Sequence, residues 1–325
     1  MTDRDGLVYA AVLDGKGGAT TVLDWDGVRQ WQTDQGPIWI HLQRNVAQSD
    51  RWLREESGLD QFTVQALLED DPRPRTAVVG DGILAVLRGV NLNPGADHED
   101  MVSVRLFVTR DRVISVRTRV LASVQAMRDD ISAGRGARTA PGVLARLADH
   151  LAVRVDPIIE GIEDRLGDLE ASISVRRSTD LRRDLHEIRR EAIALRRHIA
   201  PQRDAMNKLP GIDSPLLDTA QRSRMREVAD RTMRHVEDLD AVRDRTAVLQ
   251  DELTTQMSEQ MNRTMYLLTV VATVMLPLGF VTGLLGVNVG GIPGADTPWA
   301  FAALCAILAV LVAVEVVLLR RLRWV

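Results

Sequence analysis

The pattern of apolar and polar positions divides the 325-residue chain into three parts. In residues 1–140, short runs rich in β-branched residues alternate with turn signals and short amphipathic stretches, as in a mixed α/β domain. In residues 141–263, apolar residues recur every three or four positions, which predicts long helices. Residues 264–325 are largely apolar. We therefore predict an α+β fold with a long helical stalk and a C-terminal membrane part.

Short apolar runs in the first part predict the elements of the mixed domain. The expected strands are Leu7–Leu13, Ala19–Leu23, Pro37–Leu42, Leu84–Val90, Val102–Thr109 and Val113–Arg117, and the expected helices are Gln48–Ser57, Gln61–Glu69 and Val120–Ser132. Residues 14–18, Asp-Gly-Lys-Gly-Gly, indicate a hairpin turn between the first two strands. A phosphate loop is the alternative, but the Walker spacing and its Lys-Ser/Thr ending are missing, which favours the turn.

Three helices are predicted in the second part. The apolar repeat over residues 141–173 fits one face of a single long helix. Ser178 is a candidate N-cap for the second helix, and Ser214 followed by Pro215 is a start signal for the third. No helix breaker follows before Pro277. The third helix is therefore expected to run directly into the membrane as a stalk.

Two segments of the last part, residues 266–286 and 299–319, are long enough to cross a hydrocarbon core of about 30 Å. Only the loop 287–298 joins them, and that loop has no basic residue. Basic residues stand at the other ends of both spans: Arg263, Arg320, Arg321 and Arg323. By the positive-inside rule both termini are cytoplasmic and the loop faces outward. The N-terminus lacks the apolar segment of a signal peptide.

Glu315 is the one acid within the second span. An ionised carboxylate in hydrocarbon is costly, so two explanations arise. The acid either pairs with Arg320 or Arg321 near the cytoplasmic end, or snorkels to water there, which we favour. Alternatively, it relays protons or cations.

Composition limits the chemistry further. The net charge of −4 and the 45% of hydrophobic residues would by themselves suit a soluble protein. These values are averages over the whole chain, so they do not reveal the apolar C-terminal part. The only cysteine, Cys305, allows neither an intramolecular disulfide nor a cysteine-based metal site within one chain. The six histidines are scattered and are expected to be surface or packing residues. No nucleophile–base pair, metal cage or phosphate loop reaches motif strength, so we expect no enzyme, no prosthetic group and no nucleic-acid partner.

Small and weakly polar residues form a stripe along the first span. At about 100° per residue, they fall within an arc of about 100°. The stripe consists of Asn262, Met265, Thr269, Ala272, Leu276, Gly279 and Gly283. Such a stripe either packs helices in lipid or lines a pore. A single hairpin cannot enclose a pore, so a lining role requires an oligomer.

The motif that ends the first span resembles a known signature. Gly286-Val287-Asn288 is followed by Val-Gly-Gly-Ile-Pro-Gly over residues 289–294. This sequence resembles the Gly-Met-Asn loop of the CorA superfamily of divalent metal ion channels and transporters, which stands after the first of two C-terminal spans. The central valine and the glycines that follow look most like the ZntB branch, associated with zinc. Residues 69–75, rich in acids and prolines, agree, and the resemblance covers nearly the full chain.

The resemblance implies an assembly and a location. It implies a homopentamer in the bacterial inner membrane, with an N-terminal cytoplasmic αβα domain, a funnel of stalk helices and a pore formed by the first spans. The lipid bilayer and divalent cations, zinc by branch, would be the other partners. Magnesium-type members often carry an acid after the conserved proline, whereas this chain has Gly294 there and Asp296 as its only loop acid.

The resemblance also implies roles along the pore. Gly286, Val287 and Asn288 would be the selectivity signature, and the Asn288 carboxamides would bind the hydrated metal ion at the outer mouth. Met265 and Leu276 would form apolar constrictions. In the same way Asn262 would form an inner polar ring, while Gly279 and Gly283 would permit close approach.

Two other functions stay open at this point. One is a CorA-like channel for magnesium, cobalt or nickel, because zinc is named by branch alone. The other is a non-transporting, membrane-anchored oligomeric scaffold or sensor. The sequence leaves open the direction of transport, proton coupling and regulatory cation sites. The Gly-x-Asn motif and the small-residue stripe favour transport, because an anchor needs neither.

Overall fold

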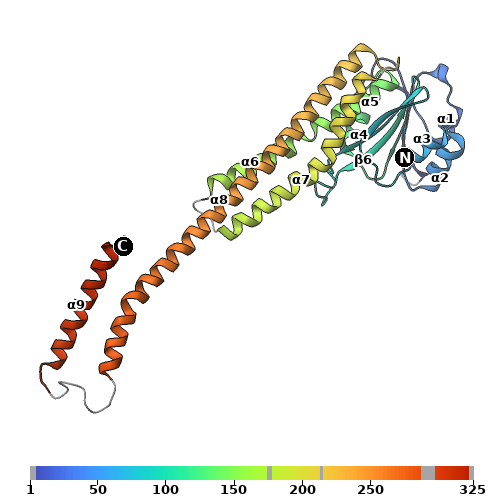
Figure 1. Cartoon of the computed structure of the whole chain (residues 1–325). Helices are drawn as coiled ribbons and strands as arrows, with labels where there is room; N and C mark the ends of the chain where they lie inside the picture. The colour runs from blue at the N-terminus through green and yellow to red at the C-terminus, as the bar shows by residue number, and fades with distance from the viewer. Residues whose placement is uncertain (1–4, 174–177, 213–214, 287–296, 322–325) are drawn as a thin grey trace. The chain divides into compact units, whose positions relative to one another are not determined.

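The structure is a computed structural model that describes residues 5–173, 178–212, 215–286 and 297–321 (Figure 1). The chain divides into two compact units, Met1–Gln250 and Asp251–Val325. The first unit holds a β-sheet, the helices that cover it and most of the stalk. The second unit holds the two apolar segments. The sequence-based boundaries at residues 140 and 263 stay predictions.

Seven strands form one mixed sheet in the order β2-β1-β3-β7-β6-β5-β4. The strands are β1 (Leu7–Leu13), β2 (Ala19–Val22), β3 (Ile38–Gln43), β4 (Arg75–Val79), β5 (Gly82–Gly89), β6 (Val102–Val108) and β7 (Arg112–Arg117). Strands β3 and β7 run parallel, whereas every other neighbouring pair is antiparallel. A parallel pair needs a long crossover connection. Here the chain between β3 and β7 builds three helical segments and the other half of the sheet.

The glycine-rich segment between β1 and β2 is the predicted hairpin turn. The Asp14 carboxylate accepts hydrogen bonds from the backbone N–H groups of Lys16, Gly17 and Gly18 at 2.7–2.8 Å. Gly17 has a φ of 120°, a conformation that favours glycine. Because these amides bind the protein's own carboxylate, the phosphate-loop alternative is wrong.

Strand β4 was not predicted. It follows a segment that contains Pro72 and Pro74, and it lies at the edge of the sheet. Its residues are half-buried or exposed, with Val78 at 52% exposure. An edge strand of this kind lacks the apolar alternation on which strand prediction relies.

Helices cover both faces of the sheet, as the αβα prediction requires (Figure 1). One face packs against α1 (Trp25–Gln30), α2 (Ala47–Arg51), the π-helical turn η3 (Trp52–Glu56) and α3 (Gln61–Leu67), and a 3₁₀ turn, η2 (Thr33–Gln35), precedes β3. The other face packs against α4 (Ala122–Ser132) and α5 (Ala140–Val153). Neighbouring residues of β6 contribute to opposite cores: Leu106 to the second and Phe107 to the first.

The single helix predicted over residues 141–173 is wrong, because the structure has two helices there. Helix α5 ends at Val153, and α6 (Asp156–Ala171) begins after a short break. Pro157 lies in the first turn of α6. Its ring would clash with the carbonyl group four residues earlier, that of Val153, so a continuous helix is interrupted at that point.

The last two helices of the first unit include the stalk. Helix α7 (Ser178–Lys208) begins at the predicted Ser178 and leads into a 3₁₀ turn, η4 (Leu209–Gly211). Helix α8 (Thr219–Leu285) begins four residues after Pro215, so the predicted start is wrong. Asp218 supplies the cap instead, because its carboxylate accepts the Gln221 backbone N–H at 2.7 Å.

Helices α6, α7 and α8 bury a common apolar seam and are joined by polar pairs. Arg196 on α7 lies 2.6 Å from Asp240 on α8, and Arg165 on α6 pairs with Glu191 on α7. Such surface pairs add little stability individually. The buried leucines, isoleucines and valines of the three helices therefore supply most of the packing energy.

In the second unit, the end of α8 and the whole of α9 (Ala300–Arg321) are long and apolar enough to cross a membrane. Helix α8 continues without interruption through Pro277 to Leu285, as predicted. Almost none of the residues in the two apolar segments is buried. Exposed apolar helices of this length are stable in lipid or against other copies.

Candidate pore helix and its lining

The predicted pore-lining residues all belong to α8, and every one of them is exposed. They are Asn262, Met265, Thr269, Ala272, Leu276, Gly279 and Gly283. The exposed fraction reaches 60% for Met265 and 78% for Leu276. Exposing side chains of this size to water is unfavourable by about 25 cal/mol per Å². This face of α8 therefore needs lipid or other copies of the chain as neighbours.

Threonine hydroxyls along α8 donate to the backbone of the preceding turn. The Thr269 hydroxyl donates to the Met265 carbonyl oxygen at 2.8 Å, and the Thr273 hydroxyl donates to the Thr269 carbonyl oxygen at 2.8 Å. A hydroxyl has one proton to donate and two lone pairs that accept. Because the proton is used within the helix, the Thr269 oxygen is left as an acceptor. Water that hydrates a cation presents protons outward, which suits such an acceptor.

Two glycines and a proline shape the outer half of the segment. A Cβ atom built at Gly279 or Gly283 would meet nothing within 4 Å in the described residues. The open surface suits a close neighbour of any kind. Pro277 lacks an N–H group, so the Thr273 carbonyl loses its helical hydrogen bond. The Thr273 carbonyl, beside the predicted lining, therefore lacks the N–H donor that it would have in a regular helix.

Gly286 is the only residue of the Gly-Val-Asn signature within the described part of the chain. Its N–H donates to the Thr282 carbonyl oxygen at 2.9 Å. A Cβ atom at Gly286 would lie 2.9 Å from the same oxygen, which is too close for any other residue without a shift. Val287 and Asn288 lie outside the described residues, so their role at the pore mouth stays a prediction.

Sequence reasoning missed Ser258, which continues the same face of α8. It precedes Leu276 by eighteen residues, which is about five helical turns, and it is exposed. Its hydroxyl donates to the Thr254 carbonyl oxygen at 2.9 Å, the same arrangement as at Thr269. The helical period would have found it, had the stripe been followed beyond the apolar segment.

Glu315 lies in α9 and has no basic partner there. One carboxylate oxygen, Oε2, is buried and accepts no hydrogen bond within the described residues. Arg320 and Arg321 follow at separations of five and six residues, whereas helical side chains meet at three or four. The favoured pairing with these arginines is therefore not formed in the described chain.

The described residues contain no group of three or more His, Cys, Asp or Glu side chains that could hold a metal ion. Two of the histidines serve packing. His41 is fully buried, with its Nδ1 2.7 Å from the Ser115 hydroxyl, and burial lowers its pKa to about 3. His235 on α8 lies 2.5 Å from Asp156, and burial lowers its pKa as well.

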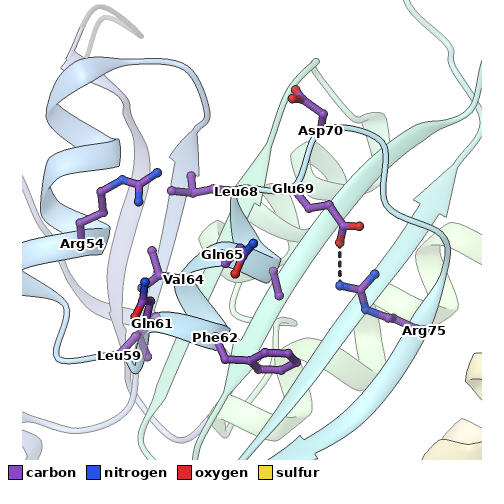
Figure 2. Close-up of a pocket in the computed structure, with 11 residues that line it drawn as sticks. Arg54, Leu59, Gln61, Phe62, Val64, Gln65, Leu68, Glu69, Asp70 and Arg75 are labelled. Carbon is purple, nitrogen blue, oxygen red and sulfur yellow. Dashed lines mark hydrogen bonds and ion pairs between the residues drawn. The ribbon is translucent and has the colours of Figure 1, made fainter.

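A cavity of about 1050 Å³ lies beside α3 in the first unit. Figure 2 shows Arg54 on one side of it and Asp70, Glu69 and Arg75 on the other. The Arg75 guanidinium donates to Glu69 at 2.6 Å. The exposed Phe62 ring completes the lining. The cavity mixes charges of both signs and shares no residue with the predicted pore lining.

Known proteins resemble the chain along its whole length. The family model described as "CorA-like Mg2+ transporter protein" matches residues 34–321. Divalent cation transporter CmaX of Pseudomonas aeruginosa is 40% identical over 324 residues, which cover 99% of this chain and 98% of that protein. Zinc transport protein ZntB of Pectobacterium carotovorum is 38% identical over 321 residues, which cover 99% of this chain and 97% of that protein.

Solved structures agree with the fold. The structure of full-length CmaX matches with a TM-score of 0.87 at 39% identity, covering 99% of both chains. The CorA magnesium transporter of Methanocaldococcus jannaschii matches with a TM-score of 0.81 over 98% of both chains, and its 17% identity makes this a likeness of fold alone. The predicted resemblance and fold class are confirmed. The chain is a divalent-cation transporter of the CorA type and belongs to the family of CorA-like Mg2+ transporter proteins.

Proposed function

We propose that the chain transports zinc across the bacterial inner membrane through a pore formed by five copies. The first apolar segment, in α8, lines this pore, and the Asn288 side chains form a ring at its outer mouth. Both termini lie in the cytoplasm. The single observation that carries the pore is the exposed face of α8, which is apolar enough for lipid yet carries oxygen acceptors.

The acceptors suit a cation that keeps part of its water shell. Dehydrating a small divalent cation is costly, so a pore that accepts hydrogen bonds from the bound water avoids that cost. The Thr269 hydroxyl oxygen and the Thr273 carbonyl are acceptors of this kind. Asn262, also exposed, adds a carboxamide at the inner end. No cage of histidine and cysteine ligands is required by this mechanism.

Apolar residues on the same face supply the gate. Met265 and Leu276 are eleven residues apart, which is about three turns, so their side chains point in nearly the same direction. Rings of such side chains narrow a pore and exclude water when they approach one another. The two constrictions bracket Thr269 and Ala272, which leave room for a hydrated ion between them.

Zinc is proposed from the relatives and from the outer loop. The ZntB relative at 38% identity is named for zinc transport. The loop carries Gly294 after Pro293 and only one acid, Asp296. A loop with one acid attracts cations less strongly than a loop with more acids. The outer loop of this chain therefore favours zinc over magnesium as the proposed cargo. Magnesium, cobalt and nickel are the competing cargoes.

The test is a comparison of metals in proteoliposomes that contain the purified full chain. We expect zinc influx to exceed influx of magnesium, cobalt and nickel, each measured with an enclosed fluorescent indicator. The mass of the protein in detergent, measured in parallel, should be that of five copies. Preference for magnesium would reject zinc. Absence of flux for all four metals would reject transport and favour a membrane-anchored scaffold.

A further inference from the structure

One face of α7 is exposed and mostly basic. Its opposite face is buried, with Leu185, Leu195 and Ile199 at 1% exposure or less. The exposed residues recur at three, four and seven positions, so they form one stripe. The stripe, called here the α7 stripe, consists of Arg190, Ile193, Arg197, Asp204 and Lys208. Ile193, the apolar residue of the stripe, is 48% exposed.

One face of α8 in the first unit is exposed and mostly acidic. It lies opposite the buried Leu239 and Val242. Its residues repeat with the same spacing as those of the α7 stripe. This α8 stripe consists of Glu227, Asp230, Arg234, Glu237, Ala241 and Asp244. Each stripe therefore has one small or apolar residue and one residue of the minority charge.

Most of these charges have no partner within one chain. Arg197, Lys208, Glu227, Arg234 and Glu237 form no ion pair in the described part of the chain. Asp204 and Asp244 pair only with the arginines next to them in sequence. Arg190 makes one long contact, 3.6 Å, with Glu99. Both stripes are thus available to a second molecule.

The contacts between α7 and α8 fix the relative height of the two stripes. Arg196 lies 2.6 Å from Asp240, and Arg189 lies 2.9 Å from Gln250. The numbering falls along α7 as it rises along α8, so the helices are antiparallel. The first contact makes Arg197 level with residue 239 of α8 and the second makes it level with residue 242, so Glu237 lies two to five residues from that height.

The same register matches the remaining residues. Moving twelve residues along α7 from Arg196 places Lys208 level with about residue 228, next to Glu227. Asp204 falls near Arg234, so the one acid of the α7 stripe meets the one base of the α8 stripe. By the same count, Ile193 falls near Ala241 and Arg190 falls within about one turn of Asp244. Four pairs of opposite charge and one apolar pair therefore lie at similar heights, and Asp230 falls between the heights of Lys208 and Asp204.

We propose that the α7 stripe of one copy packs against the α8 stripe of the next copy around a ring. Copies related by rotation about an axis parallel to α7 and α8 keep the same heights, so the register within one chain then carries over to neighbours. The contact is head-to-tail, because different surfaces meet, and such contacts form a ring when the rotation between copies closes. This inference rests on the oligomer of the proposed function and names the surfaces that build it.

Disulfide cross-linking in membrane vesicles tests the contact. The full chain with Cys305→Ala, Ile193→Cys and Ala241→Cys should, on oxidation, give a ladder of cross-linked species up to the complete ring. Each single-cysteine variant should give no ladder. The matched control replaces Ala241→Cys with Asp230→Cys, which is exposed on the same face but lies about 16 Å away along α8. No ladder, or an equal ladder with the control, would overturn the proposal.

Charge reversal gives an independent readout. Arg197→Glu or Glu237→Arg alone should reduce the fraction of assembled protein in detergent several-fold. The double variant should restore assembly, which a folding defect would not do. The mass of the unchanged protein separates the two proposals: a monomer would overturn both, whereas an intact ring without the 193–241 cross-link or the rescue would overturn this contact alone.

Discussion

The hydroxyl of Thr269 donates a hydrogen bond to the carbonyl oxygen of Met265, one turn earlier on α8, at 2.8 Å. The bond satisfies the hydroxyl proton within the helix and leaves the oxygen as an acceptor. A polar residue can therefore lie in an apolar segment at little cost and still bind water. In the proposed pore, this acceptor lies between the Met265 and Leu276 constrictions.

Replacing Thr269 tests whether that acceptor matters. Thr269→Val keeps the shape of the side chain but removes the oxygen, and it should lower zinc flux by about fivefold, the effect of one hydrogen bond of about 1 kcal/mol. Thr269→Ser keeps the acceptor and should retain flux. Flux is measured in proteoliposomes at equal protein density. A valine variant as active as the serine variant would remove Thr269 from the pathway.

Glycine substitution tests the close approach at the outer half of the pore. Gly279→Ala meets no atom within 4 Å in the described chain, so the variant should fold normally. It should nevertheless lower flux, because the added methyl groups crowd the space between copies. Gly161→Ala is the matched control, since Gly161 lies in α6 with equally open surroundings. Equal flux in both variants would show that Gly279 does not face the pore.

The buried His41 predicts a pH dependence of stability. Burial, and next the charges of Arg117 and Arg128, lower its pKa from 6.5 to about 3. Below about pH 6.5, His41 binds a proton in the unfolded chain but stays neutral in the folded chain. The free energy of unfolding therefore falls as the pH drops below 6.5. Between pH 7 and pH 5 the loss should be about 2 kcal/mol.

The measurement is denaturant unfolding followed by the fluorescence of the six tryptophans. They include Trp39, whose ring centroid lies 6.1 Å from that of His41. The comparison is His41→Gln, which carries no ionisable group. Between pH 7 and pH 5, the free energy of unfolding of the variant should fall by about 2 kcal/mol less than that of the unchanged protein. Parallel pH profiles for the two proteins would contradict the assignment.

The cap of α8 predicts a stability effect far from the apolar segment. The Asp218 carboxylate accepts the Gln221 N–H, and the Gln221 side chain accepts the Asp218 N–H at 3.0 Å. Asp218→Ala should lower the free energy of unfolding by about 1 kcal/mol, whereas Asp218→Asn should lower it less, because asparagine also caps. Hydrogen exchange in the first turn of α8 locates the effect. Unchanged exchange in the alanine variant would reject the capping role.

The sequence predicted elements well where one local signal dominated. The strand Leu7–Leu13 and the uninterrupted helix through Pro277 follow from strong apolar runs, and the structure confirms both. Errors arose where two signals competed. Pro157 broke an apolar repeat that otherwise continued, and Asp218 replaced Pro215 as the start of α8. Edge strand β4 lacked any local signal.

The contacts between elements distant in sequence could not be predicted from the single sequence. The parallel pairing of β3 with β7 joins residues more than seventy positions apart, and no local pattern encodes it. The pore-lining residues of α8 were predictable from the helical period alone, although Ser258 was overlooked. The two stripes of α7 and α8 required the register set by the contacts of Arg196 and Arg189. A single sequence offers no such register.

The most direct test of transport through the Asn288 ring is zinc influx into proteoliposomes for the unchanged chain and for Asn288→Ala. Alanine lacks the carboxamide oxygen that would bind the hydrated cation. The unchanged chain should carry zinc at a rate well above protein-free vesicles, and Asn288→Ala should reduce that rate at least several-fold while the assembled mass stays the same. Equal influx for the two proteins, at equal assembly, would contradict the account.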